Sequence, residues 1–406
     1  MGTAAETTVQ SVESARTRML RAVRALGSEP VALQEACGRI LAESLPATRD
    51  QPPFPSSAMD GYAVRCADLV LRRLNVVGEA AAGSAYPAPL QKGQAVRIFT
   101  GAPVPQGADA VIPQERVLRE GADIIVDEAP RPGKNIRGVA IDFAAGSLLI
   151  DAGTRLRAGH IALIAATGVA SVNVSRAPRI ALLATGSEIA APGTKAGPDQ
   201  IYDSVSFGLA AMIEDWGGVA RRCAASPDDP AAISRALGDA ACDADLAVMI
   251  GGASVGDYDV VKQALAARGL EIAVPKVAVR PGKPTWFGAI GRQPILGLPG
   301  NPTAAFVCAG LFLRPLLDGF LGRHSAQVCV PAILDGEVGR NGENEAYLRA
   351  RATVGADARL TVRPFDNQDT SLVSVFAAAN ALIRRLPAAG PAAHGELVDV
   401  LLLHCR

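Results

Sequence analysis

Three short segments combine glycines with hydroxyl or carboxylate side chains, so that backbone can approach a ligand while polar groups hold it. They read Thr-Gly-Ser-Glu from Thr185, Gly-Gly-Ala-Ser-Val-Gly-Asp-Tyr-Asp from Gly251, and Leu-Pro-Gly-Asn-Pro-Thr from Leu298. Each follows an apolar run typical of a buried strand. We therefore expect all three at the carboxyl ends of parallel strands, where open α/β sheets bind ligands. Taken alone, the first segment is more typical of a simple helix start.

The segment that begins at Gly251 has the most direct chemical interpretation. Asp257 and Asp259 suit Mg²⁺, which prefers one or two carboxylates together with phosphate oxygens. The alternative is that one of them only caps the next helix. Three glycines and two acids in nine residues exceed what a helix entry needs, so we favour a functional loop.

A basic turn follows, with Lys276, Arg280 and Lys283 within eight residues and two prolines between or beside them. Lys and Arg total 40 and Asp and Glu total 40, so positive potential must be gathered locally. A stiff basic turn suits phosphate or a similar oxyanion; the alternative is a solvated charged loop. Further along, Pro299 and Pro302 flank Gly300, which suits a wall for a flat ligand or a set of N–H donors, but also a plain rigid turn.

Two other dense segments lie earlier in the chain. One contains Asp60, within Pro-Pro-Phe-Pro-Ser-Ser-Ala-Met-Asp-Gly-Tyr, and the other contains Thr100, within Ile-Phe-Thr-Gly-Ala-Pro. Asp before Gly is the usual composition of a turn. Hydroxyls, an acid and an aromatic residue in a proline-stiffened stretch favour a site instead.

The elements that must position these residues follow from periodicity. Val9 to Leu26 predicts an amphipathic helix ending at Gly27, followed by a second helix over about Leu33–Leu45. Short β-prone runs without helical period extend from Thr48 to about Gly146. From Arg179 to about Gly322 buried strands alternate with helical stretches, which indicates a parallel α/β sheet. The helices expected there span Ser204–Trp216, Asp259–Arg268 and Thr303–Leu321, and the short alternating runs after His324 predict a small antiparallel barrel or sandwich.

Composition excludes several classes. The balanced charge disfavours nucleic acid as a partner, and the apolar stretches 161–174 and 304–317 are too short for membrane helices, so we interpret them as core. The N-terminus has no signal-peptide pattern. Seven scattered cysteines without a CxxC pair fit a reduced cytoplasmic location.

Six segments in this order resemble the molybdopterin molybdenumtransferase family, which includes MoeA and the gephyrin E domain. They read SSAMDGYAVR, RIFTGAPVPQGADAVIPQE, LLATGSEI, MIGGASVGDYD, RPGKPTWFG and GLPGNPTAAF, and the match extends over essentially the whole chain. The resemblance implies a multidomain α/β fold. Its parts are a helical and linker region (1–47 and 147–178), a β-rich module (48–146), a three-layer α/β molybdopterin-binding domain (179–323) and a C-terminal small β-barrel (324–406).

The resemblance also implies an activity, the insertion of molybdate into adenylylated molybdopterin with release of AMP, dependent on Mg²⁺. It implies a homodimer whose cleft lies between the α/β domain of one subunit and the β-rich module of the other, with the upstream adenylyltransferase as a further partner. Two alternatives stay open: a scaffold or chaperone without turnover, and a tungstate-specific paralogue. The missing adenylyltransferase domain and the retained anion-binding residues favour the enzyme.

Carried over by motif, catalytic roles fall to Asp60, Thr100, Asp142, Glu188, Asp228 and Asp259, and the metal to Asp257, Asp259 and Glu188. Cofactor binding falls to Gly251, Gly252, Ser254, Lys276, Arg280, Lys283, Pro299, Gly300, Pro302 and Ser371. Two departures from the family pattern matter. Asp228 is followed by Asp229, either of which fits the role, and Gln368–Ser374 replaces a glycine-rich stretch, which puts Ser371 in question.

Overall fold

The computed structural model describes residues 9–252, 260–323 and 328–403, and the chain separates into two compact units. The first contains Met1–Glu29, Gly38–Ala42 and Val174–Arg406; the second contains Pro30–Cys37 and Glu43–Asn173. The three glycine-bearing loops belong to the first unit, and Asp60 and Thr100 to the second.

A six-stranded sheet forms the centre of the first unit, in the order β16-β13-β17-β21-β20-β18. Its strands are β13 (Arg179–Ala184), β16 (Val219–Arg222), β17 (Leu246–Ile250), β18 (Leu270–Val274), β20 (Trp286–Ile290) and β21 (Gln293–Leu298). The first four strands in spatial order are parallel, as predicted, whereas β20 pairs antiparallel with both of its neighbours, β21 and β18. The short connection between β20 and β21 leaves no room for a crossover helix, which explains the antiparallel edge.

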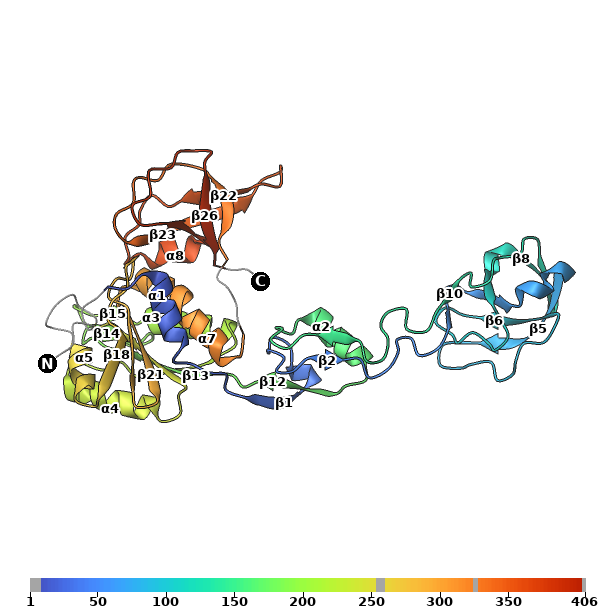
Figure 1. Ribbon diagram of the computed structural model, residues 1–406, viewed down its shortest axis with the longest axis horizontal. Helices are drawn as coiled ribbons and strands as arrows, with labels where there is room; N and C mark the ends of the chain where they lie inside the picture. The colour runs from blue at the N-terminus through green and yellow to red at the C-terminus, as the bar shows by residue number, and fades with distance from the viewer. Residues whose placement is uncertain (1–8, 253–259, 324–327, 404–406) are drawn as a thin grey trace. The chain divides into compact units, whose positions relative to one another are not determined.

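Helices cover both faces of this sheet and make the predicted three-layer arrangement (Figure 1). On one face Leu182 and Val248 pack with α1, α3 and the run α6-η4-α7; on the other, Leu183 and Met249 pack with α4 and α5. The alternation of faces along one strand is the period-2 pattern of a doubly covered sheet. The bounds are α1 (Val12–Leu20), α3 (Val205–Asp215), α4 (Pro230–Ala241), α5 (Val260–Ala266), α6 (Pro302–Cys308), η4 (Ala309–Leu313) and α7 (Arg314–Phe320); β14 (Ile189–Ala190) pairs with β15 (Ile201–Tyr202).

The run Pro302–Phe320 is long and apolar enough to cross a membrane by length and composition alone. However, 83% of its most apolar window is buried inside the protein. It is therefore a core helix, as predicted for this stretch.

The rest of the first unit is a small closed barrel of five strands. It consists of β22 (Val330–Leu334), β23 (Glu345–Val354), β24 (Leu360–Pro364), β25 (Ala381–Arg385) and β26 (Leu397–Leu402), with β19 (Val279–Arg280) added beside β23 and α8 (Val373–Ala378) before β25. Pairing of β25 with both β26 and β23 closes it. The barrel is confirmed, although β22 and β24 pair in parallel rather than antiparallel.

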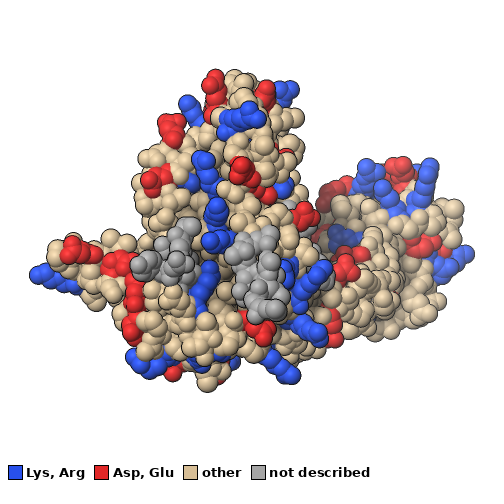
Figure 2. All heavy atoms as spheres, turned by 60° about the vertical axis from the view of Figure 1, so that its left-hand side comes forward, with Lys and Arg blue, Asp and Glu red and all other residues tan. Residues whose placement is uncertain are grey.

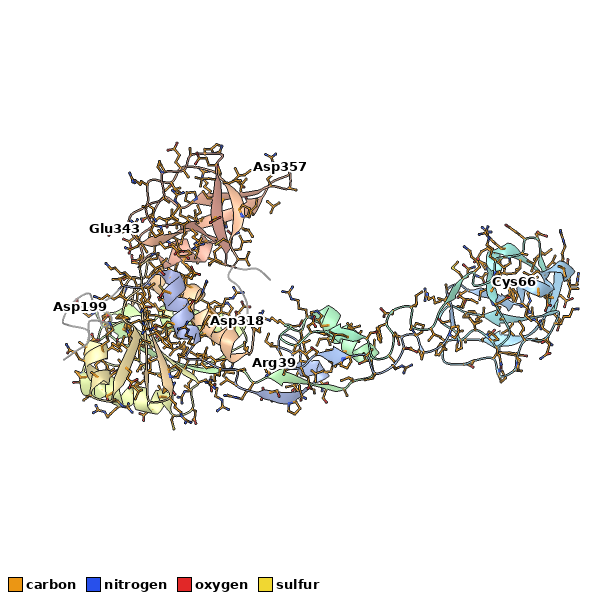
Figure 3. The ribbon with its side chains drawn as sticks, viewed as in Figure 1. Arg39, Cys66, Asp199, Asp318, Glu343 and Asp357 are labelled. Carbon is orange, nitrogen blue, oxygen red and sulfur yellow. The ribbon has the colours of Figure 1, made fainter. Side chains whose placement is uncertain are left out.

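The second unit is dominated by another six-stranded sheet, in the order β7-β4-β6-β5-β9-β8, as expected for a β-rich module. Its elements are β4 (Gly61–Val64), η2 (Cys66–Leu71), β5 (Arg73–Ala80), β6 (Gln94–Ile98), β7 (Ala110–Pro113), η3 (Gln114–Arg116), β8 (Val117–Glu120) and β9 (Asp123–Val126). Beside it β3 (Ser56–Ser57) pairs with β10 (Ile136–Arg137). Cys66 lies among these elements (Figure 3), and burial raises the pKa of its thiol to about 12.

The helical predictions near the N-terminus need correction. The first helix ends at Leu20, not at Gly27, and a helix over Leu33–Leu45 is wrong: only η1 (Leu33–Glu35) forms there. Gly38 has φ +86°, and Ile40 accepts from the amide of Ser175, so this backbone is committed to extended pairing. The remaining elements are β1 (Ser28–Ala32) paired with β12 (Ser171–Ser175), β2 (Leu45–Pro46) paired with β11 (Leu148–Ile150), and α2 (Ala158–Ala166).

Candidate functional site

The three glycine-bearing loops predicted from the sequence lie side by side at the carboxyl ends of β13, β17 and β21. The amide of Thr185 donates to the carbonyl of Ile250 at 2.9 Å, and the amide of Gly251 donates to that of Leu298 at 3.1 Å. The strand ends are thus in register, and the loops leave the same edge of the sheet. This is the edge at which open α/β folds bind ligands.

Glycine is required where these loops touch. Gly251 and Gly252 have φ of +87° and +64°, a region that favours glycine. A Cβ on Gly252 would lie 2.2 Å from Cγ2 of Val261, and one on Gly300 would lie 3.3 Å from Cα of Gly251. Gly300 is therefore packed against the backbone of Gly251, and Gly252 against a side chain of α5. Ser254, Asp257 and Asp259 lie outside the described residues.

The structure separates the roles of the two adjacent acids after β16. Asp229 caps α4, because its carboxylate accepts from the amide of Ala232 at 2.7 Å. Asp228 instead lies near Glu188, and partial desolvation followed by the Glu188 charge raises its pKa, against a hydrogen bond from the amide of Ser187. A carboxylate whose charge is disfavoured by burial and by a neighbouring acid is stabilised by a cation. Asp229 is thus engaged in the helix cap, whereas Asp228 faces Glu188.

The basic turn lies in the same unit and has no acidic partner in the part of the chain that the structure describes. Lys276 is half-buried and Arg280 and Lys283 are exposed, and none of the three forms an ion pair with another described residue. Figure 2 shows Lys and Arg atoms gathered in a column on this face of the first unit. The turn packs closely against α6, since a Cβ on Gly282 would lie 2.0 Å from Sγ of Cys308.

Sequence reasoning missed a fourth cation, Arg349 in β23. The residue is 1% exposed, its Nη2 donates to the carbonyl of Asp369 at 3.1 Å, and its Nε has no hydrogen-bond partner among the residues that the structure describes. Desolvation lowers its pKa, the Asp369 carboxylate opposes this, and the nearby charge of Arg280 adds to the lowering. Alternation along the strand could have found it, because Arg349 follows Tyr347 by two residues and so lies on the same buried face of β23. A buried guanidinium with a free N–H beside another cation is suited to an anion.

The segment Gln368–Ser374, which departs from the family pattern, lies next to Arg349. The Asp369 carboxylate accepts from the amide and the hydroxyl of Ser371 at 2.8 and 2.7 Å, which lowers the pKa of Asp369. Thr370 accepts from the amide of Thr303 at 3.0 Å, at the start of α6. Ser371 is therefore held beside the loop with Pro299, which is buried, and Pro302, the first residue of α6.

In the second unit, Asp60 and Thr100 are in direct contact. The Asp60 Oδ1 accepts from the amide and the hydroxyl of Thr100, each at 2.8 Å, and these bonds, with Arg97 adding to them, lower the pKa of Asp60. Arg97 lies over the rings of Tyr62 and Phe99, with its guanidinium carbon 5.1 and 4.9 Å from the centroids. Asp60 is thus a charged, oriented group rather than a simple turn residue.

Asp142 is less well explained. It is exposed, its amide donates to the carbonyl of Gln51 at 3.0 Å, and no hydrogen bond to its carboxylate occurs within the described part of the chain. Likewise, the described residues contain no group of three or more His, Cys, Asp and Glu side chains placed to hold a metal. Glu188 and Asp228 are two possible metal ligands, one fewer than such a group requires.

A three-layer α/β domain with glycine loops at its strand ends, a buried arginine and a cationic turn is the kind of domain suited to phosphate-like anions. The comparisons with known proteins specify the family. Residues 10–168 match the MoeA N-terminal region (domain I and II), 181–319 a probable molybdopterin binding domain, and 331–403 the MoeA C-terminal region (domain IV).

Whole-chain relatives agree with these matches. A molybdopterin molybdenumtransferase of Haemophilus influenzae is 32% identical over 96% of this chain and 98% of its own, and one of Nostoc sp. is 38% identical over 79% and 76%. The solved molybdopterin biosynthesis MoeA protein from Pyrococcus horikosii has a TM-score of 0.86 and 31% identity, covering 98% of this chain and 100% of its own. The chain belongs to the molybdopterin molybdenumtransferase family, and the resemblance predicted from the sequence is confirmed.

Proposed function

We propose that this chain inserts molybdate into adenylylated molybdopterin and releases AMP. Membership of the family makes it a transferase of molybdenum cofactor biosynthesis. In the proposed reaction the two dithiolene sulfurs bind molybdenum, and one molybdate oxygen leaves with the two thiol protons as water. A second water molecule cleaves the phosphoanhydride, leaving AMP and the phosphorylated pterin. No protein nucleophile is needed.

The observation that carries this proposal is the gathering of unpaired cations in a chain of zero net charge. Arg280, Lys283 and half-buried Lys276 make no ion pair with a described residue, and Arg349 keeps a free buried Nε. Oxyanions of molybdate and of the anhydride supply the missing acceptors. Fixed cations need no rearrangement when charge builds up during the reaction, which is the largest single source of catalysis in many enzymes.

We further propose a requirement for Mg²⁺. Glu188 and Asp228 fit this ion, because the two carboxylates lie near each other, burial followed by the Glu188 charge raises the pKa of Asp228, and Mg²⁺ takes one or two carboxylates plus phosphate oxygens. Asp257 and Asp259, predicted as further ligands, lie outside the described residues. The bound ion would polarise the phosphoanhydride. The protein's own carboxylates would hold the ion and orient the attacking water.

We also propose a cytoplasmic homodimer in which one subunit supplies Asp60, Thr100 and Asp142 from its β-rich module, while the other supplies the glycine loops and cations. The support is the family relationship and the division of these residues between two units of the chain. The upstream adenylyltransferase is the proposed source of the pterin substrate, because that compound carries a reactive anhydride.

The test is direct. Purified protein is given adenylylated molybdopterin, Mg²⁺ and molybdate, and AMP release and molybdenum on the pterin are measured together. Competing tungstate in the same assay determines the preferred metal oxyanion. Binding of the pterin without AMP release at any Mg²⁺ concentration would favour the alternative, a non-catalytic scaffold.

A further inference from the structure

The N-terminal segment is hydrogen-bonded to the loop that carries Lys276. The amide of Gln10 donates to the carbonyl of Lys276 at 3.0 Å, and the carbonyl of Gln10 accepts from the amide of Ala278 at 2.7 Å. Gln10 thereby pairs with Val277 in a parallel bridge. Gln10 is far from this loop in sequence, since 263 positions separate it from Ala273. It nevertheless holds the start of the cationic turn.

The other side of this loop is attached to the barrel. The carbonyl of Ala278 accepts from the amide of Glu345 at 3.0 Å, and β19 pairs in parallel with β23. The segment from Lys276 to Arg280 is therefore the middle strand between Gln10 and the barrel. Loss of the Gln10 pairing would remove two backbone hydrogen bonds at the Lys276 end and leave the bond from the amide of Val277 to the carbonyl of Lys283, while β19 still holds the Arg280 end.

The side chain of Gln10 reinforces the same register. Its Nε2 donates to the carbonyl of Ala273 at 3.3 Å, and its Oε1 is buried without a partner among the described residues. A buried amide oxygen without a partner opposes folding. Within the described part of the chain, what the side chain adds is therefore a bond to the backbone at Ala273, three residues before Lys276.

Gln10 is itself firmly anchored by the helix that follows it. The Ser11 hydroxyl caps α1 by accepting from the amide of Ser14 at 3.2 Å, and Val12, Ala15 and Met19 are buried in the core of the first unit. The pairing with the loop is thus a contact between two fixed parts of the unit.

We propose that Gln10 is a positioning residue that sets the place of Lys276 and so the affinity of the cationic turn for oxyanions. This inference rests on the proposed function, because it requires that the turn bind molybdate or phosphate. The physical reason is that an ammonium group attracts an anion well only from a fixed place, and displacement by about 1 Å weakens such a site markedly.

The experiment compares four variants of the full-length chain. Gln10→Ala removes the bond to Ala273; Gln10→Pro also removes the N–H that Lys276 accepts from, since proline has none. Ser11→Ala is the matched control, because it weakens the α1 cap and leaves the Gln10 bonds in place. Lys283→Gln tests the turn itself. For each, kcat and the KM for molybdate are measured at saturating adenylylated molybdopterin, with thermal unfolding as a check on folding.

We expect the KM for molybdate to rise about threefold in Gln10→Ala and about tenfold in Gln10→Pro, with kcat little changed. Ser11→Ala should lower the unfolding temperature but keep the wild-type KM. If Lys283→Gln raises the KM while both Gln10 variants keep the wild-type value, Gln10 has no positioning role. If Gln10→Pro does not fold, Gln10→Ala alone decides. If Lys283→Gln also has no effect, the assignment of the turn to oxyanion binding is wrong, and this inference fails with it.

Discussion

At the scale of single residues, hydrogen bonding and burial act on the candidate site in opposite directions. Asp60 and Asp369 are surrounded by N–H and O–H donors that lower their pKa values and keep them charged. Desolvation raises the pKa of Asp228 and lowers that of Arg349, so both charged states are disfavoured until an opposite charge arrives. The first pair are therefore fixed anions, and the second pair are groups that an ionic ligand would stabilise.

The Asp60–Thr100 contact gives a prediction about pH. Removing the hydroxyl in Thr100→Val should raise the pKa of Asp60 toward its ordinary value of 3.8, but not fully, because the amide of residue 100 still donates. The carboxylate is charged above its pKa, so the variant should lose its charge at a higher pH than wild type as pH falls. Carbon-detected NMR titration of the Asp60 carboxyl measures this, and Thr100→Ser is the control that keeps the donor. Identical titration curves for Thr100→Val and wild type would contradict the assignment.

The cations give a second prediction. Replacing exposed Lys283 by Gln should raise the KM for molybdate about tenfold, and the difference from wild type should shrink as salt rises. Replacing buried Arg349 by Gln should also raise the KM, but with weaker dependence on salt, since buried charges are screened less. Steady-state kinetics at several salt concentrations test both. If Lys276, Arg280 and Lys283 can each be replaced without changing the molybdate dependence, the backbone N–H groups of the glycine loops become the better candidates.

At the scale of elements, the close packing of loops at the strand edge accounts for the glycines. Gly252→Ala places a Cβ against Val261 and also requires an unfavourable positive φ. Gly269→Ala is a matched control, since Gly269 has φ +80° and no atom within 4 Å of an added Cβ. We expect the control to lower the free energy of unfolding by about 1 kcal/mol from φ alone, and Gly252→Ala to lower it by roughly 2–4 kcal/mol.

The double variant Gly252→Ala with Val261→Ala separates the two costs, because it removes the contacting methyl group. Denaturant titration should show that the pair costs less than the sum of its single changes. Strict additivity would mean that the contact with Val261 is not what excludes a side chain at position 252.

The loop after Gly252 gives a prediction from sequence alone. Asp257→Ala and Asp259→Ala should each reduce AMP release by about a hundredfold or more while leaving folding intact, because carboxylates that hold Mg²⁺ cannot be replaced by a methyl group. The rate of AMP release is measured across a range of Mg²⁺ concentrations, with circular dichroism as the folding control. Wild-type rates in both variants at every Mg²⁺ concentration would remove these residues from the metal site.

The sequence predicted the elements with a strong local signal and missed those set by tertiary contacts. The runs that became β13, β17 and β21 are apolar throughout, so both their burial and the loops after them could be predicted. The helix expected over Leu33–Leu45 did not form, because pairing of Ile40 with Ser175 depends on residues far away in sequence. Arg349 was missed for the same reason, since its burial depends on how the barrel meets Asp369 and Arg280.

At the scale of the whole molecule, the candidate residues are divided between two units of the chain. Asp60 and Thr100 form a complete hydrogen-bonded group in the second unit, while the cations and the glycine loops belong to the first. Neither group holds all the parts that the proposed reaction needs: the cations and glycine loops would supply anion binding, and Asp60 with Thr100 would supply an oriented carboxylate. A homodimer would allow each cleft to take one group from each subunit, since every contact across a two-fold axis occurs twice.

This arrangement predicts complementation between two inactive variants. Asp60→Ala and Asp259→Ala should each be inactive alone. After equimolar mixing and full subunit exchange, half of the dimers are heterodimers, and each has one cleft with both residues intact, so activity should recover to roughly a quarter of the wild-type rate. AMP release measures the recovery, and native mass spectrometry of a tagged variant verifies exchange. If each cleft used residues of a single subunit, every cleft in the mixture would still lack one carboxylate, and verified exchange without recovery would exclude the shared cleft.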